Sequence, residues 1–161
     1  MKTSDNGRKF IEGFEGLILG AYDDANDRIV KPGEHVYGTL TIGYGHTSAA
    51  GLPHVYTGMT ITQAQADQIL ASDLAAIESD ITHFVKVPIN QNQFDALVSF
   101  DFNTGALGRS NVLRSINSKH FSEVPNDLMM WVHAGGQVSK GLVRRRHAEA
   151  VMFTTAMAAK V

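Results

Sequence analysis

The sequence predicts an α+β fold that is mainly helical, in which a small antiparallel sheet lobe and a helical lobe are joined by one long helix. Three observations predict it: turn-rich alternation near the N-terminus, one long stretch of helical periodicity, and a remainder divided into shorter helices. The 161 residues suit a single domain over 1–161. We expect a sheet lobe at about 16–60, a connecting helix at about 62–83, and a helical lobe at about 84–161 plus the N-terminal helix, with a cleft between the lobes.

The N-terminal third predicts one helix followed by the sheet. Apolar residues recur at helical spacing over about residues 4–15, so a short helix should end close to Glu15. From residue 17 to 47 the pattern changes to alternating segments separated by the turn-rich stretches DDANDR and KPGEH. Such segments are typical of strands and tight turns. We therefore expect a small antiparallel sheet of at most three strands.

The helices after the sheet are marked by their end signals. Thr62 and Gln65 form a capping-box pattern before a periodic stretch of about five turns. The segment QNQFDALVSFDFNTG predicts a buried helix that is closed by Gly105. The remaining predicted boundaries are helix starts near Ser110 and Ser122, a helix end at Gly135 and Gly136, and a last helix at about 140–155.

Composition excludes several kinds of site. The chain has no cysteine, which excludes disulfides, thiolate metal sites and a cysteine nucleophile. Its seven histidines show no His-Glu-x-x-His or comparable ligand spacing, so we expect no metal and no cofactor. The polar N-terminus lacks the apolar core of a signal peptide, and no segment approaches the roughly 18 apolar residues of a membrane span. Stable membrane insertion is therefore not expected.

Charge is distributed unevenly along the chain. Residues 1–100 carry 6 basic and 12 acidic side chains, whereas residues 101–161 carry 8 basic and 4 acidic ones. The basic part suits a polyanion such as cell wall, although solvated helix faces account for the same charges. The run Arg144 to Arg146 lacks interleaved aromatics, so we expect no nucleic-acid partner. Three consecutive helical residues point in different directions, so at least one arginine should face inward or toward the cleft. The run should also pair within its helix with Glu149 and form a basic rim that faces the wall.

Two acids of the N-terminal region are candidates for glycosidic bond cleavage, which needs a proton donor and a second carboxylate. Glu15 lies where the first helix ends, and Asp24 follows one strand. The apolar neighbours of Glu15 favour a protonated acid, whereas the polar turn around Asp24 favours a carboxylate. Spacing alone leaves open that both are ordinary surface charges. Asp23 is a rival to Asp24.

The sequence resembles the phage lysozymes, glycoside hydrolase family 24, in the segments EGLILGAYDD, TIGYGHT, QFDALVSFDFNTGALGRSNVLRSIN and GLVRRRHAEA. The resemblance implies the two-lobed lysozyme fold, with Glu15 as general acid, Asp24 as general base and Thr41 as the hydroxyl that helps to hold water. It implies hydrolysis between N-acetylmuramic acid and N-acetylglucosamine with inversion, and no cofactor. By the same resemblance, the candidate substrate contacts are Thr47, Phe102 and Asn103, and ordinary aromatic packing is the alternative for Phe102.

Three features beyond the proposed acids carry expectations of their own. The stretch 26–40 is longer than the compact turn of the shortest family members, so the sheet should bear an extended hairpin. His46 is expected to be structural and to pair with Asp73 on the long helix, because a buried imidazole needs a hydrogen-bond partner. The apolar residues Met129, Met130 and Trp131 should pack in a helical core.

The function that these observations favour is that of an endolysin that digests peptidoglycan glycan strands and lyses the host cell. It would accumulate as a monomer in the host bacterial cytoplasm and act on periplasmic peptidoglycan after a holin-type factor permeabilises the membrane. Two alternatives stay open. A lytic transglycosylase uses one glutamate without a base, and a wall-binding module would retain the scaffold without turnover.

Overall fold

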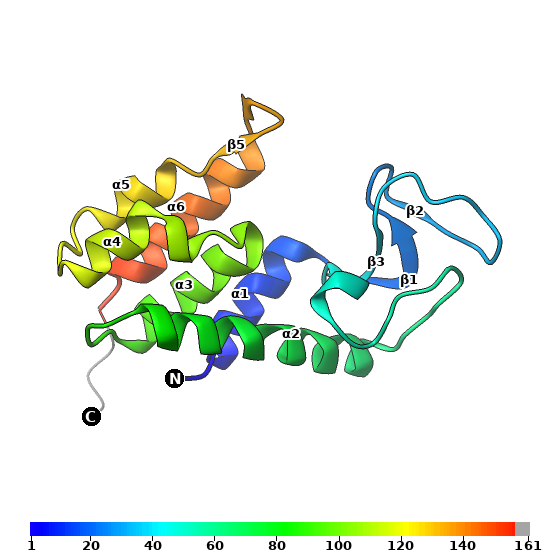
Figure 1. The fold of residues 1–161 in the computed structure, drawn as a ribbon, viewed down its shortest axis with the longest axis horizontal. Coiled ribbons are helices and arrows are strands. Elements are labelled where there is room, and N and C mark those ends of the chain that lie inside the picture. The colour runs from blue at the N-terminus through cyan, green and yellow to red at the C-terminus, as the bar shows by residue number, and fades with distance from the viewer. Residues whose placement is uncertain (157–161) are drawn as a thin grey trace. The chain divides into compact units, whose positions relative to one another are not determined.

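The computed structural model describes residues 1–156, which form six α-helices and short antiparallel strands (Figure 1). The predicted α+β, mainly helical fold class is confirmed. The elements are, in order, α1 (Asp5–Glu15), β1 (Ile18–Asp23), β2 (Arg28–Ile29), β3 (Leu40–Gly43), β4 (His46–Thr47), a 3-10 turn (Ser48–Ala50), α2 (Gln63–Phe84), α3 (Gln91–Thr104), a second 3-10 turn (Leu107–Arg109), α4 (Asn111–Asn117), α5 (Val124–Met129), β5 (His133–Ala134), β6 (Gln137–Val138) and α6 (Lys140–Thr154).

The chain divides into two compact units. We call Glu12–Ala76 the sheet unit, and Met1–Ile11 together with the chain from Ile77 onward the helical unit. The sheet unit therefore includes the first part of α2, which lies beyond the predicted sheet lobe at 16–60. Both boundaries fall inside helices, within α1 and α2.

The sheet unit contains a four-stranded antiparallel sheet in the order β2-β1-β3-β4. Tyr22 of β1 pairs with Ile29 on one side and with Thr41 of β3 on the other. The apolar face of the sheet packs into a small core formed by Ala21, Ile42 and Met59, with Leu40, Val55 and Ile61 around them. This core fixes the backbone that carries the candidate acids.

The expectation of at most three strands is wrong, since the sheet has four. The strands β2 and β4 are each only two residues long. Such short strands give no detectable alternation in sequence and form only through their pairing. The extended hairpin expected at 26–40 is also largely wrong. Apart from β2, that stretch is an irregular loop held by hydrogen bonds to β1.

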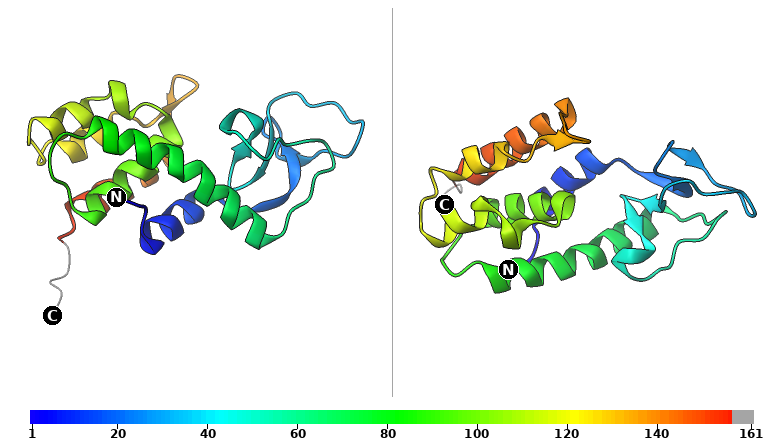
Figure 2. Two further views of the ribbon diagram at one scale, coloured as in Figure 1. Left: turned by 60° about the horizontal axis from the view of Figure 1, so that its bottom comes forward. Right: turned by 45° about the horizontal axis from the view of Figure 1, so that its top comes forward.

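The helical unit is built from packed helices, with α3 against α6, α5 against α6, and α4 against α5. Figures 1 and 2 show these four helices from three directions. Residues of α3 are buried almost without interruption from Phe94 to Asp101. Asn90 and Gln93 form a capping box at its start, and Gly105 closes it with a left-handed φ of 58°, as the sequence predicts. The predicted capping box of α2 is present as well, between Thr62 and Gln65.

One predicted helix end is wrong. The helix expected from near Ser122 to Gly135 and Gly136 stops at Met129, and a two-stranded hairpin follows. Both glycines have positive φ, 59° and 79°, and they form the hairpin turn between β5 and β6. Two consecutive residues of positive φ suit a two-residue hairpin turn, so the glycine pair marks a turn between strands.

Candidate active site

Glu15 is the last residue of α1, and the chain turns into β1 directly after it. Gly16 has a φ of 71°, a left-handed conformation that suits glycine at a helix end. The carboxyl group of Glu15 faces the turn between β3 and β4. A Cβ atom placed on Gly45 would lie 3.6 Å from Glu15 Oε2. The predicted acid is therefore close to the TIGYGH segment, within the sheet unit.

Asp24 is exposed, and both its carboxyl and its backbone are hydrogen-bonded to Thr39, the residue before β3. Its Oδ1 accepts a hydrogen bond of 2.6 Å from the backbone N–H of Thr39, and its own N–H donates to the Thr39 carbonyl over 3.2 Å. Gly38 packs so closely on this carboxyl that a Cβ atom there would lie 2.2 Å from Oδ1. Any larger residue at position 38 would therefore displace Asp24.

Asp23, the rival acid, has a different environment. Its side chain is fully buried, and it accepts backbone hydrogen bonds from Tyr37 at 2.6 Å, Gly38 at 2.9 Å and Ala25 at 3.0 Å. The Tyr37 N–H bond is the main cause that lowers the pKa of Asp23, against the opposing effect of burial. Asp23 is thus turned into the protein, and Asp24 is the acid that faces outward.

Thr41 is buried on β3, where its Oγ1 donates a hydrogen bond of 3.0 Å to the Thr39 carbonyl. In the sheet register, Thr41 pairs with Tyr22 on one side and with Thr47 on the other. Thr47 is half-buried. The structure therefore brings Thr41 and Thr47 side by side, next to the strand that ends at Asp23 and Asp24.

Tyr22 connects the two predicted acids electrostatically. Its pKa is raised, first by burial and then by the carboxylates of Asp27, Asp24 and Glu15. Glu15 and Asp24 therefore act on the same phenol hydroxyl. Tyr22 is not among the site residues predicted from the sequence. The available signal was its place between the two acids of the EGLILGAYDD segment, beside the pair Asp23 and Asp24.

His46 and Asp73 lie in contact, which is the pairing that the sequence predicts. His46 is buried on β4, with Nδ1 2.8 Å from an Asp73 oxygen and Nε2 2.8 Å from the Pro53 carbonyl. A carbonyl only accepts, so Nε2 carries a proton and Nδ1 shares one with the Asp73 carboxyl. Burial is the main cause that raises the pKa of Asp73, and His46 opposes it.

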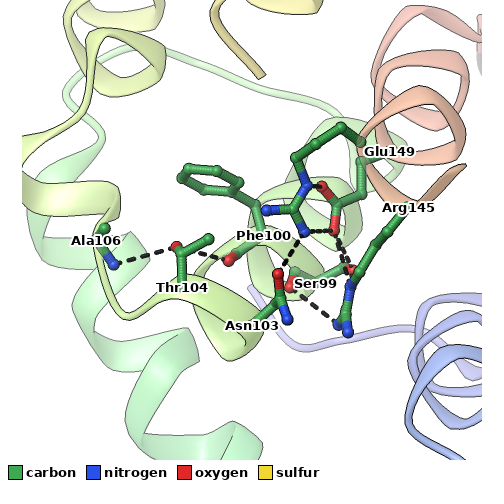
Figure 3. Close-up of polar contacts among 8 residues, drawn as sticks. Ser99, Phe100, Asn103, Thr104, Ala106, Arg145 and Glu149 are labelled. Atoms are coloured by element: carbon green, nitrogen blue, oxygen red, sulfur yellow. Dashed lines mark hydrogen bonds and ion pairs between the residues drawn. The ribbon is translucent and has the colours of Figure 1, made fainter. Parts of the chain in front are cut away.

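Phe102 and Asn103 lie in α3, in the helical unit, whereas the other predicted site residues belong to the sheet unit. Phe102 is half-buried, and Asn103 accepts a hydrogen bond of 2.9 Å from Arg146 Nη2 (Figure 3). The amide oxygen of Asn103 is thus part of a charged network within the helical unit.

That network contains two of the three consecutive arginines, whereas Arg144 is exposed. Arg145 and Arg146 are buried, and both contact Glu149, at 3.2 Å and 2.7 Å. Ser99 donates to the same carboxyl over 2.6 Å (Figure 3). Burial raises the pKa of Glu149, and the neighbouring Arg146, Ser99 and Arg145 oppose that rise. The pairing with Glu149 and an inward-facing arginine are both as predicted, and Arg145 and Arg146 face the core because their carboxylate partner lies there.

The expected core packing of the Met129, Met130 and Trp131 group is wrong for Met130. That side chain is 63% exposed, because α5 ends at Met129 and the chain then turns into the hairpin. Trp131 and Met129 are half-buried, and Trp131 packs edge-on against Phe100 with ring centroids 5.6 Å apart. The apolar run was therefore a helix end rather than a continuous buried helix.

Metal sites and membrane-spanning helices are both absent from residues 1–156. Among those residues, no group of three histidines or acids is arranged to hold a metal ion. No helix in the same range is both long and apolar enough to cross a membrane.

Fold and site together define a phage-type lysozyme. The family model described as phage lysozyme matches residues 12–149, and the chain belongs to that family, whose members are glycoside hydrolases that cleave peptidoglycan. The chain is 36% identical to the endolysin of Salmonella phage P22 over 156 residues, which cover 96% of this chain and 99% of that protein.

Two further relatives show how the chain compares in length and fold. It is 36% identical over 157 residues to the endolysin of Bacillus phage B103, but it spans only 55% of that protein's length. The solved structure of an endolysin from Escherichia coli O157:H7 phage FAHEc1 superposes with a TM-score of 0.82 at 33% identity, and covers 99% of this chain and 98% of that one. The shared part is therefore the lysozyme unit as a whole.

Proposed function

We propose that this chain is an endolysin that hydrolyses the β-1,4 bond between N-acetylmuramic acid and N-acetylglucosamine in bacterial peptidoglycan, with inversion. Glu15 donates a proton to the leaving glycosidic oxygen as the bond to the anomeric carbon breaks. Asp24 takes a proton from the water whose oxygen bonds to that carbon, and the Thr41 hydroxyl helps to hold the water. The steps need only protein side chains and one water.

The placement of the candidate residues within the sheet unit is the observation that carries this proposal. The Glu15 carboxyl faces Gly45 in the turn between β3 and β4, and the Asp24 carboxyl accepts the N–H of Thr39, two residues before Thr41 on β3. The raised pKa of Tyr22, to which both carboxylates contribute, agrees with this placement. The exposure of Asp24 supports its role as base, since a base must reach water, whereas Asp23 has its oxygens engaged by backbone N–H groups. Membership of the phage lysozyme family supports the choice of substrate.

The direct test compares wild type with Glu15→Gln in the clearing of permeabilised Gram-negative cells. Glutamine keeps the size of the side chain but cannot donate the acidic proton, so clearing should slow by about 10²- to 10⁴-fold. Matching circular dichroism and melting temperatures would show that both chains are folded. Equal clearing by the two chains would reject the catalytic assignment.

Mass spectrometry of the digest separates the alternatives. Hydrolysis adds one water at each cut and leaves a reducing N-acetylmuramic acid, whereas a transglycosylase leaves an anhydro sugar. A wall-binding module would release no fragments at all. Anhydro products, or none from folded wild type, would overturn the proposed hydrolysis.

The proposal extends to lysis of a host cell. A monomer made in the host bacterial cytoplasm would reach periplasmic peptidoglycan once a holin-type factor opens the inner membrane. The phage endolysins among its relatives support this step. Expression in a Gram-negative host should cause lysis only when a holin is co-expressed, and lysis without one would contradict the dependence.

A further inference from the structure

The loop between β2 and β3 presents an exposed aromatic side chain. Tyr37 is 73% exposed, which makes it one of the two most exposed large apolar or aromatic side chains in the described chain. Its neighbour His35 packs against it edge-to-face, with ring centroids 4.6 Å apart at 82°. An aromatic ring left in water forgoes the gain of burial, so its placement needs a reason.

The position of Tyr37 is fixed from beneath by Asp23. Its backbone N–H donates a hydrogen bond of 2.6 Å to Asp23 Oδ2, and the next residue, Gly38, donates one of 2.9 Å to Oδ1. The accepting carboxyl is fully buried. Hydrogen bonds to a buried carboxylate are stronger than those between neutral groups, so this stretch of the loop is held firmly.

The same stretch of loop also contacts the proposed base. Gly38 lies against the Asp24 carboxyl, and Thr39 donates its N–H to Asp24 Oδ1 over 2.6 Å. The loop therefore carries, in three consecutive residues, an exposed ring and three backbone N–H bonds to the adjacent acids Asp23 and Asp24. The backbone that carries the exposed ring is thus bonded to Asp23 and, two residues on, to the proposed base, which suits the ring to contact the same substrate.

We propose that Tyr37 is a substrate-binding residue that stacks on a sugar ring of the glycan strand, and that Asp23 is the positioning residue that holds it there. This inference rests on the proposed function, which makes the substrate a glycan. A pyranose ring presents an apolar C–H face that packs on an aromatic ring while its hydroxyls stay in water. Tyrosine suits such a surface, since its body is apolar and its hydroxyl is wet.

Binding, rather than turnover, tests this assignment. Glycan strands freed of their peptide stems are titrated against chains that all carry Glu15→Gln, so that cleavage is too slow to deplete the strands during the titration. Adding Tyr37→Ala should weaken binding by about 5- to 10-fold, as expected for loss of one aromatic contact. Tyr37→Phe should bind like the parent, because it keeps the ring. Unchanged affinity in Tyr37→Ala would overturn the assignment.

Tyr56→Ala serves as the matched control. Tyr56 is also a highly exposed tyrosine of the sheet unit, at 63%, but no hydrogen bond ties its loop to Asp23 or Asp24 in the described chain. Its loss should leave glycan affinity unchanged. Equal weakening by Tyr56→Ala and Tyr37→Ala would mean that general surface stickiness, and not a site at Tyr37, holds the strand.

A double-mutant cycle tests the role of Asp23. In Asp23→Asn one acceptor oxygen becomes a donor amide, which faces the donor N–H of Tyr37 or Gly38. Affinity should fall, and adding Tyr37→Ala should cost little more, because both changes remove one contact. Fully additive losses would overturn the positioning role. If Asp23→Asn fails to fold, Tyr37→Ala alone still decides the sugar contact.

The outcome is distinguishable from failure of the proposed hydrolysis. Hydrolysis is measured by digestion with the wild-type chain, and binding is measured separately with the chains that carry Glu15→Gln. In wild-type background, Tyr37→Ala should raise KM more than it lowers kcat. Loss of binding without any wild-type digestion would leave a glycan-binding surface and reject the enzyme, whereas digestion with unaffected binding would reject Tyr37 alone.

Discussion

The sheet unit and the helical unit use buried carboxylates in different ways. In the sheet unit, Asp23 and Asp24 are held by backbone N–H groups of one loop, and Asp24 stays exposed. In the helical unit, Glu149 is fully buried and is held by side chains, the hydroxyl of Ser99 and two guanidinium groups. The first arrangement leaves the Asp24 carboxyl accessible to solvent, whereas the second buries the Glu149 carboxyl among its partners.

The difference shows what makes an acid available for chemistry. A carboxylate that accepts a backbone N–H and remains exposed, as Asp24 does, keeps lone pairs free for water and substrate. Glu149 is surrounded by donors and has no solvent contact, so its charge serves the packing of α6 on α3. Burial and the kind of donor, not residue type, separate the two roles.

The largest effect on stability should come from the helical unit. Glu149→Gln removes the charge that two buried guanidinium groups contact, and breaking a buried ion pair in this way costs about 3–5 kcal/mol. Denaturant unfolding would measure it. Asp5→Asn is the control, because its pair with Arg8 is at the surface and should change the free energy of unfolding by less than about 1 kcal/mol. Equal small losses would contradict the contrast.

A smaller loss is expected from the buried pair of the sheet unit. Asp73→Asn weakens the partner of His46 Nδ1 and should lower the free energy of unfolding by about 1–3 kcal/mol. Glu123→Gln, which alters the exposed pair with His120, should change it by less than about 0.5 kcal/mol. An unchanged titration of His46 in Asp73→Asn, followed by NMR, would remove the pairing.

The pH dependence of the Asp23 loop should be the smallest effect. The pKa of Asp23 is lowered in the folded chain from an ordinary 3.8, chiefly by the Tyr37 N–H bond. Its stabilisation is therefore complete above the ordinary pKa and is lost as pH falls through the folded pKa. The difference in unfolding free energy between wild type and Asp23→Asn should stay constant from about pH 7 to 5 and shrink at lower pH. A difference that grows on acidification would contradict the bonding described here.

Helix positions could be predicted from sequence because helical signals are local. The capping box of Thr62 and Gln65 is present at the start of α2, as predicted. Gly105 ends α3, also as predicted. The two-residue strands β2 and β4 could not be predicted, since only pairing with distant segments defines them. Gly135 and Gly136 were read as a helix end because glycine marks both helix ends and hairpin turns.

In the candidate site, too, some residues could be predicted from sequence segments, whereas the contacts between distant residues could not. Glu15, Asp24 and Thr41 could be proposed from a resemblance of short segments, and their roles remain predictions. The clamp of Asp23 on Tyr37 joins residues 14 apart through backbone N–H groups, which no residue pattern encodes. The burial of Arg145 and Arg146 depends on Ser99 of α3, far away in sequence. Both features needed coordinates.

The most direct test of the account compares the two neighbouring acids of the sheet unit. Hydrolysis of soluble glycan strands is measured for Asp24→Asn and Asp23→Asn, each shown to be folded by circular dichroism. We predict that Asp24→Asn loses about 10²- to 10⁴-fold in kcat, whereas Asp23→Asn turns over far faster than Asp24→Asn and shows mainly a raised KM. Turnover by Asp24→Asn at the wild-type rate, or an inactive but folded Asp23→Asn, would contradict the assignment of Asp24 as the base.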